Sequence, residues 1–223
     1  MLRYIVWRLL FELCNLWRLL GHGSERVQYL AFGANLSEAI MNERRIRPFA
    51  MKPFTLRDHG LRFDHPGPWI GCAYASVEPA IGESVYGFLY TLSLRDAARM
   101  DFYEAVPIIR RYRRTWVEQD GERLYYYQTN RSTPGLKPTD EYLGYIVSGL
   151  EAHPEVCGEY REAMKKTETG EPGRWVSSYL WKQPEGRSPW LRGLVELYQR
   201  IVLMIFLKIL YRYSLTAFLI RYK

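Results

Sequence analysis

Two strand-like segments joined by an aspartate–glycine turn restrict the fold of this chain more than any other feature. Residues 113–119 (RRTWVEQ) and 124–129 (LYYYQT) are rich in aromatic and β-branched side chains, and Asp120-Gly121 lies between them. An Asp-Gly pair readily adopts the left-handed backbone of a two-residue hairpin turn. The sequence therefore predicts an antiparallel hairpin here. Further strand-like runs occupy residues 29–32 and 84–92.

Helical patterns lie next to these strands. Residues 93–105 predict a helix that Ser93 opens as N-cap, with Asp96 three residues further on. Residues 139–150 and 155–166 predict two more helices beyond a proline-rich loop, and Thr139 is the expected cap of the first. The central region of the chain is therefore expected to contain both strands and helices.

The positive charge of the chain is concentrated at its two ends. Residues 1–28 carry four arginines against two glutamates, and residues 186–223 carry seven basic side chains against one acidic one. The middle, residues 29–185, is nearly neutral with 20 basic and 21 acidic side chains. A nucleic-acid-binding protein should carry its basic stripe on the folded domain, so this distribution argues against nucleic acid.

Both ends also have an apolar face. Residues 1–20 repeat leucine, isoleucine and valine at helical spacing, and glycines 21 and 23 follow. Residues 190–222 are largely apolar but are interrupted by charges, so no run reaches the roughly 20 residues of a simple membrane span. Basic, apolar helices of this kind favour an anionic membrane surface. The alternative is that the two ends pack on each other or on a second protomer.

Three cysteines at wide spacing give no disulfide framework, which favours a reducing compartment. The four histidines are scattered, and no paired metal-ligand motif occurs. We therefore expect no metal and no cofactor. Together with the basic ends, this composition predicts a cytoplasmic protein attached peripherally or monotopically to the inner face of a membrane.

A glycine-containing turn follows the first strand of the central region, in YLAFGANLS at residues 29–37. Glycine at the end of a strand allows successive backbone N–H groups to point outward, where they can hold an anion. Taken alone, such a Gly-Ala-Asn segment is more often an ordinary turn.

A carboxylate among apolar residues forms the second motif, MDFYEAVP at residues 100–107. Asp101 and Glu104 are three residues apart and so share one helix face. If Glu104 points inward, desolvation would raise its pKa and suit it to proton transfer near neutral pH. The alternative is a solvated carboxylate at a helix end.

The order and spacing of these motifs resemble the γ-glutamylcyclotransferase family over residues 29–160. The family's Tyr-Gly-Ser-Asn-Leu loop corresponds to FGANL here, and VYGFLY at residues 85–90 resembles its Val-x-Gly strand. The family's Asp-x-x-Glu-Gly-Val helix end corresponds to Asp101 through Val106. KPTDEYL at residues 137–143 and the stretch 146–160 resemble its last two segments.

This resemblance implies an α+β fold, a small mixed β-barrel with flanking helices, to which the chain adds N- and C-terminal apolar or amphipathic helices. The domain would occupy residues 28–166, between an amphipathic helix at 1–27 and a linker or surface loop at 167–189. A basic, apolar helical tail would follow at 190–223. The family's chemistry is the cyclisation of a γ-glutamyl group, which releases 5-oxoproline and a free amine.

The resemblance also assigns roles to individual residues. Glu104 takes the family's catalytic position as acid and base. The implied substrate-binding residues are the loop, whose backbone N–H groups would hold the substrate α-carboxylate, and three tyrosines near the pocket: Phe32, Gly33, Ala34, Asn35, Leu36, Tyr112, Tyr126 and Tyr142. The expected partners are a small-molecule or lipid-linked γ-glutamyl amide and an anionic membrane surface. A homodimer is compatible with the sequence.

Three departures from the family pattern leave alternatives open. Phe32 and Ala34 replace a tyrosine and a serine, which removes two hydroxyls from the loop, and Ala105 replaces a glycine. Backbone contacts survive these changes, whereas side-chain contacts do not. The alternatives are a non-catalytic binding or scaffold member of the fold at the membrane, and a related transferase acting on other γ-glutamyl amides.

Overall fold

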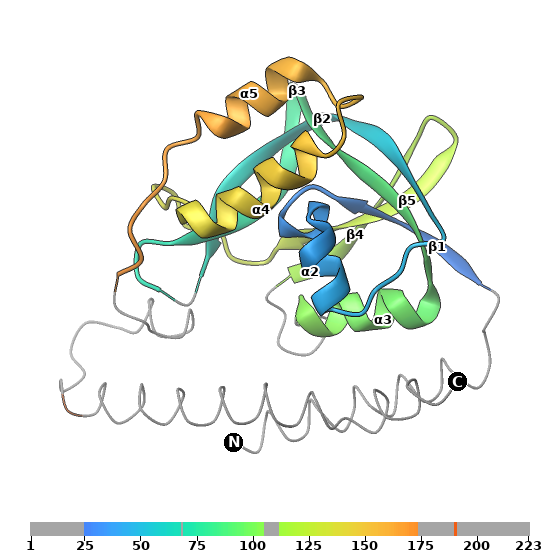
Figure 1. The fold of residues 1–223 in the computed structure, drawn as a ribbon, viewed down its shortest axis with the longest axis horizontal. Helices are drawn as coiled ribbons and strands as arrows, with labels where there is room; N and C mark the ends of the chain where they lie inside the picture. The colour runs from blue at the N-terminus through green and yellow to red at the C-terminus, as the bar shows by residue number, and fades with distance from the viewer. Residues whose placement is uncertain (1–24, 68, 105–111, 174–189, 191–223) are drawn as a thin grey trace.

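The computed structural model describes residues 25–67, 69–104, 112–173 and residue 190. Figure 1 shows the strands with helices along one side and at one end. The strands are β1 (Arg26–Ala31), β2 (Ala50–Pro66), β3 (Ala73–Ser93), β4 (Tyr112–Gln119) and β5 (Glu122–Thr129). The helices are η1 (Ala34–Leu36), α2 (Glu38–Glu43), α3 (Leu94–Tyr103), α4 (Asp140–Glu151) and α5 (Gly158–Lys165). This mixed content confirms the α+β class.

The five strands form one mixed sheet in the order β2-β3-β1-β5-β4. Strands β1 and β5 pair in parallel, and the other neighbours pair antiparallel. The predicted closed barrel is wrong, because the sheet is open: in the described part of the chain no backbone ladder joins its edge strands, β2 and β4. Side chains bridge them instead. The Gln119 amide donates to the Thr55 carbonyl at 2.7 Å and accepts from the Arg57 N–H at 3.0 Å.

The hairpin of β4 and β5 has the predicted turn. Asp120 and Gly121 both have positive φ, 55° and 76°, as a type I′ turn requires. The register places Trp116 opposite Tyr125 and Arg114 opposite Tyr127. Because side chains alternate along a strand, Tyr126 faces away from both of these tyrosines.

A long hairpin of β2 and β3 was only partly expected, because residues 50–66 lack a clear alternation. The first part of β2 is largely exposed, and Lys52 and Pro53 suit an edge strand. Residues 84–92, predicted as a strand, form the second half of β3. The register of the pair shifts between Arg57 and His59, beside a projecting segment in which Ile81 is 97% exposed.

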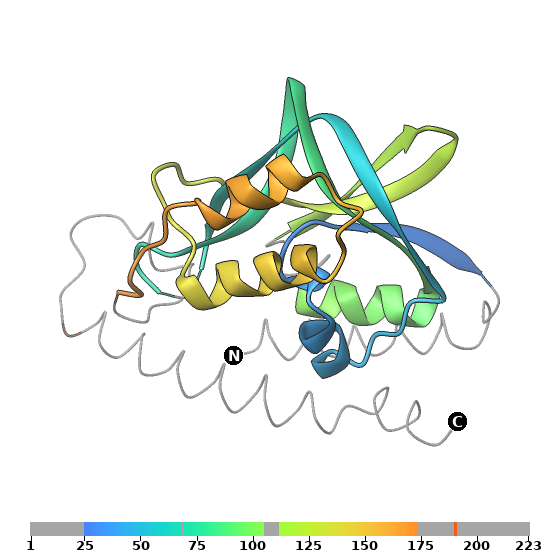
Figure 2. The same cartoon turned by 45° about the horizontal axis from the view of Figure 1, so that its top comes forward.

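Helix caps agree with the sequence. The Ser93 hydroxyl accepts from the Asp96 N–H at 3.0 Å and donates to the Asp96 carboxylate at 3.1 Å, so α3 begins where predicted. Thr139 accepts from the Tyr142 N–H at 3.2 Å at the start of α4. Helices α4 and α5 lie side by side along the sheet, while α2 and α3 lie near β1 (Figures 1 and 2). The short helix α2 was not predicted.

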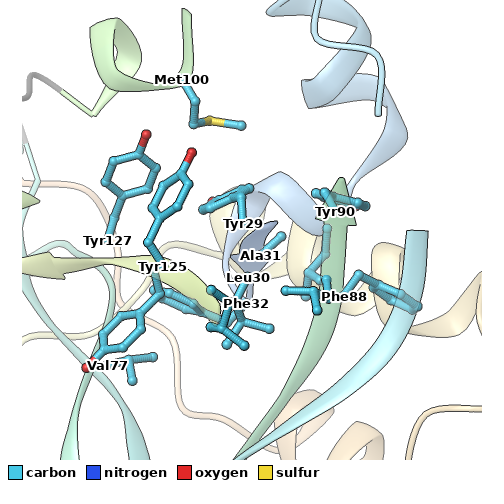
Figure 3. Close-up of a cluster of buried hydrophobic side chains, with 14 of the residues drawn as sticks. Tyr29, Leu30, Ala31, Phe32, Val77, Phe88, Tyr90, Met100, Tyr125 and Tyr127 are labelled. Atoms are coloured by element: carbon cyan, nitrogen blue, oxygen red, sulfur yellow. The ribbon is translucent and has the colours of Figure 1, made fainter. Parts of the chain in front are cut away.

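The core contains an unusual share of tyrosine. Tyr29 of β1 and Tyr125 and Tyr127 of β5 are buried, with ring centroids 5.4 to 5.6 Å apart. Figure 3 shows Tyr125 and Tyr127 on the same side of β5, directed toward Met100 of α3. Helix α3 is thus held against β1 and β5 by the same tyrosine face that leads to the site described below.

One glycine allows the chain to turn sharply after β1. A Cβ at Gly87 of β3 would lie 2.0 Å from the Ala31 carbonyl oxygen, so any larger residue would push the two strands apart. The glycine of the VYG segment therefore lets β1 end close against β3, where the FGAN loop begins.

Residues 167–173, within the predicted linker or surface loop, form neither helix nor strand but make specific contacts. The Gly170 N–H donates to the Pro138 carbonyl at 2.9 Å, and the Gly173 N–H donates to the Ile70 carbonyl at 3.2 Å. The helices predicted for residues 1–27 and 190–223 lie outside the described residues, apart from their inner ends. Among the helices that are described, none is long and apolar enough to cross a membrane.

Candidate active site

A cavity of about 300 Å³ opens where the FGAN loop, α2, the end of α3, β5 and α4 meet. Seven tyrosines make its wall strongly aromatic while leaving hydroxyls to form hydrogen bonds. A single carboxylate, Glu104, and a single guanidinium, Arg44, belong to the described part of the wall. The lining residues are Tyr29, Phe32, Gly33, Ala34, Asn35, Ile40, Arg44, Tyr74, Ala75, Tyr103, Glu104, Tyr112, Tyr127, Tyr142 and Tyr145.

The loop after β1 brings four of the five predicted loop residues to this cavity. Its tight turn is fixed by a 2.9 Å bond from the Leu36 N–H to the Gly33 carbonyl. Leu36 does not line the cavity, because its side chain is 3% exposed and packs in the core. Its N–H is also already bonded, so the expectation that every N–H from Gly33 to Leu36 faces a substrate is too broad.

A tyrosine from α4 lies beside the loop and is bonded to strand β3. The Tyr142 hydroxyl accepts a 3.0 Å bond from the Ala75 N–H. Burial raises the pKa of Tyr142, while the backbone N–H groups of Ala75 and Ala34 favour its ionised form. Tyr142 therefore joins α4, β3 and the loop as a neutral phenol at neutral pH.

Glu104 directly follows α3 and has a side chain only 14% exposed. Its Oε1 atom accepts from Arg44 Nη1 at 2.9 Å and, at 3.4 Å, from Asn35 Nδ2. The same Asn35 amide donates to the Tyr29 hydroxyl at 2.7 Å. No hydrogen bond to Glu104 Oε2 is recorded from the described residues. This carboxylate is thus oriented through one oxygen, and the other remains available.

Arg44 at the end of α2 completes the network. Its Nη1 atom donates to Asn35 Oδ1 at 2.7 Å as well as to Glu104, and its guanidinium lies 4.7 Å from the centre of the Tyr103 ring. Burial lowers the pKa of Arg44, but the attraction of Glu104 outweighs this effect and the pKa is raised. Sequence reasoning missed Arg44, since nothing in so short a helix indicates that the residue capping its end reaches a carboxylate 60 positions away.

The other carboxylate of the motif, Asp101, has a structural role. Asp101 is 4% exposed and accepts two bonds from Arg114, at 2.7 and 2.8 Å. It also accepts from the Tyr127 hydroxyl at 2.8 Å. Asp101 therefore ties α3 to β4 and β5, and only Glu104 of the pair lines the cavity.

Two of the three predicted tyrosines line the cavity. Tyr112 and Tyr142 do so, and the Tyr112 hydroxyl donates to the Ala75 carbonyl at 3.3 Å. Tyr126 lies on the opposite face of β5, packed against Phe32 and His59. The neighbouring Tyr127 lines the cavity in its place, because side chains alternate along the strand.

Other lining tyrosines were not predicted as site residues: Tyr29, Tyr74, Tyr103 and Tyr145. Tyr29 begins the YLAFGANLS motif, and its position at the end of β1 is the signal that could have identified it. Within the described residues no cluster of histidine, cysteine and carboxylate side chains could hold a metal ion. Cys72 and Cys157 carry free thiols.

No protein-family model and no curated protein matches this chain. Solved structures do. A γ-glutamyl cyclotransferase superposes with a TM-score of 0.57 at 21% identity, covering 70% of this chain and 95% of its own. An uncharacterized human protein gives a TM-score of 0.57 at 21% identity, covering 70% and 96%. YkqA from Bacillus subtilis gives 0.54 at 17% identity, covering 70% and 60%.

These likenesses confirm the fold expected from the sequence motifs: the domain has the fold of γ-glutamyl cyclotransferase. At such identities the comparison concerns the fold, so the activity must be argued from the cavity and its residues.

Proposed function

We propose that this protein is a γ-glutamyl cyclotransferase-type enzyme, which releases 5-oxoproline and a free amine from a γ-glutamyl amide. The observation that carries the proposal is the position of Glu104. It is a shielded carboxylate in a polar, tyrosine-lined cavity beside the FGAN loop, within the fold of γ-glutamyl cyclotransferase.

The chemistry needs one group that can accept and return a proton. Glu104 takes a proton from the substrate α-ammonium, and the freed amine attacks its own γ-carbonyl carbon. A bond forms between the α-nitrogen and that carbon, and the bond from the carbon to the leaving nitrogen breaks. Glu104 returns its proton to the leaving nitrogen as that bond breaks. The carboxylate then accepts the second proton of the new ring nitrogen and passes it to the freed amine, which leaves as an ammonium, so one carboxylate serves every transfer.

Positioning supplies much of the rate enhancement, because ring closure is intramolecular. Asn35 and Tyr29 orient the Glu104 side chain through the bonds described above. Tyr142 braces the loop against Ala75. Phe32 and Ala34 leave the loop without side-chain hydroxyls, so the substrate contacts on this side come from the backbone.

A Glu104→Gln variant tests the catalytic assignment. Glutamine keeps the size and hydrogen bonds of the side chain but cannot carry the proton. We expect 5-oxoproline release to fall by at least about 100-fold, the lower range for general acid–base catalysis. The melting temperature should change by no more than a few degrees. Product is measured by mass spectrometry on a panel of γ-glutamyl amines, peptides and a lipid extract.

Glu118→Gln is the matched control, since Glu118 is an exposed carboxylate on β4 away from the cavity. It should retain wild-type activity. If Glu104→Gln keeps near wild-type activity, Glu104 is not the base. If the wild-type protein forms product from no member of the panel, the proposed enzymatic function is wrong.

A binding or scaffold protein of the same fold is the alternative function. The observation that favours it is the 2.9 Å ion pair between Arg44 and Glu104, which already engages one oxygen of the carboxylate. This alternative predicts that γ-glutamyl compounds bind to the wild-type protein without turnover.

Attachment to an anionic membrane surface, on the cytoplasmic side, is the second part of the proposal. It is supported by the basic, apolar sequence patterns of residues 1–27 and 190–223. At a membrane the leaving amine can belong to a small molecule or to a lipid headgroup, and the panel above includes both.

A further inference from the structure

The Arg44 guanidinium is only partly used by its neighbours in the cavity wall. Nη1 carries the recorded bonds, to Asn35 Oδ1, to Glu104 Oε1 and, at 3.5 Å, to Met100 Sδ. No bond from Nε or Nη2 to the described part of the chain is recorded, and neither atom is among the buried polar atoms that lack a partner. The side chain is 20% exposed, at the cavity surface.

This pattern leaves one edge of the guanidinium open. Nε and Nη2 form a planar fork of donors that matches the two oxygens of a carboxylate. The other edge is fixed by Glu104 and Asn35, and the Tyr103 ring lies against the guanidinium. Arg44 is therefore held in place while its unused donors remain free for an anion.

The FGAN loop has fewer free donors for an anion than its sequence suggested. The Leu36 N–H is bonded to the Gly33 carbonyl, and the Ala34 N–H is directed at the Tyr142 hydroxyl, where it lowers the pKa that burial raises. The loop carries no positive charge and, with Ala34, no hydroxyl at that position. The positive charge that pairs with an anionic substrate group must therefore come from a residue outside the loop. Arg44 is the cationic side chain in the described cavity wall.

We propose that Arg44 is a specificity-determining residue that binds the α-carboxylate of the γ-glutamyl substrate, while Glu104 receives the α-ammonium. This inference rests on the proposed function. A γ-glutamyl group carries an ammonium and a carboxylate on one carbon, and the Arg44–Glu104 pair presents the complementary charges side by side. The open Oε2 of Glu104 and the open fork of Arg44 are the contacting atoms.

Matched substrates test this inference. One γ-glutamyl amide has a free α-carboxylate, and the other is identical except for an α-carboxamide. The wild-type protein should prefer the carboxylate in kcat/KM by about 10- to 100-fold, the range for a charge-assisted hydrogen-bonded contact. Arg44→Met should lose this preference by lowering the value for the carboxylate substrate alone. Arg44→Lys should retain part of it, because charge remains without the planar fork.

Binding provides a readout independent of turnover. In the Glu104→Gln background, titration calorimetry with the carboxylate substrate should show a Kd raised about 10- to 100-fold by the added Arg44→Met change. The carboxamide substrate should bind both variants equally. Arg45→Met, at the adjacent exposed arginine, is the control and should change neither the preference nor the Kd.

Three outcomes would overturn the inference, and a fourth separates it from the proposed reaction. Equal losses for both substrates would mean that Arg44 only supports the fold of the site. An increase in activity would mean that Arg44 restrains Glu104 and does not bind substrate. An unchanged preference in Arg44→Met would assign the carboxylate to the loop, with the proposed reaction intact. If the wild-type protein forms no product yet Arg44→Met abolishes carboxylate-selective binding, the reaction is wrong and the Arg44 contact stands.

Discussion

Two carboxylates three residues apart, Asp101 and Glu104, have different environments at the end of one helix. Asp101 is satisfied by Arg114 and Tyr127 inside the core. Glu104 shares its cation with Asn35 and lines the cavity. Their spacing places them on the same side of α3, but the strands packed against the helix decide which one a substrate can reach.

Buried tyrosines make the free energy of unfolding depend on pH. Burial raises the pKa of Tyr29, Tyr126 and Tyr127 above the ordinary value of about 10. Above that pH the unfolded chain loses these protons while the folded chain keeps them. Ionisation therefore favours the unfolded state, and the free energy of unfolding should decrease as the pH rises beyond about 10. Urea denaturation at a series of alkaline pH values measures this slope.

Tyr126→Phe is the variant that isolates one of these groups, because no hydrogen bond to its buried hydroxyl is recorded among the described residues. Above pH 10 the free energy of unfolding should fall less steeply with pH than in the wild-type protein, by the equivalent of about one proton. Folding at neutral pH should be retained. A slope equal to that of the wild-type protein would show that Tyr126 ionises equally in both states.

At the scale of elements, the sheet is held in its curled shape by side chains where backbone pairing stops. Gln119 at the end of β4 bonds to the backbone of β2 on both sides of Leu56, at Thr55 and Arg57. Arg57 also pairs with Asp120 in the adjoining turn. These contacts connect the two edges of the sheet, although no ladder closes it.

Replacing Gln119 with alanine removes this connection. Two hydrogen bonds at a partly exposed site contribute about 0.5–1.5 kcal/mol each, so we expect Gln119→Ala to lower the free energy of unfolding by about 1–3 kcal/mol. Hydrogen exchange should accelerate at the Arg57 amide. The neighbouring Glu118→Ala is the control, since Glu118 is exposed on the other face of β4. Unchanged exchange at Arg57 would show that β2 is held there without Gln119.

On the scale of the whole molecule, the charge distribution separates the domain from the chain ends. The nearly neutral stretch 29–185 contains the cavity and the sheet apart from the first three residues of β1, whereas residues 1–28 and 186–223 carry the excess of basic side chains. Electrostatic attraction to anionic lipid adds to the burial of apolar side chains in the interface, so both should contribute to attachment.

Flotation with lipid vesicles measures the attachment. The full chain should float with vesicles that contain anionic lipid, and less so with neutral vesicles or at high salt. A variant lacking residues 1–24 and 174–223 should stay in solution. Full-length protein that remains soluble without detergent and does not float with anionic vesicles would disprove the proposed attachment.

Local signals determined the parts of this protein that depend on neighbouring residues. Asp120-Gly121 specifies its turn because few residues tolerate positive φ, and Ser93 and Thr139 begin their helices because their hydroxyls bond to nearby N–H groups. The ordered FGAN, VYG and Glu104 motifs were enough to indicate the fold. They also placed Phe32 to Asn35, Tyr112 and Tyr142 among the candidate site residues, and all of these line the cavity.

Tertiary structure alone decided which side chains meet across long separations. The pairing of Arg44 with Glu104, the choice of Tyr127 over Tyr126 and the open form of the sheet depend on how α2, α3 and β5 pack. No sequence pattern near Arg44 indicates that its partner is Glu104, at the end of another helix. Charge pairs between distant elements are set by packing, and for this reason the sequence identified the carboxylate while the structure supplied its cation.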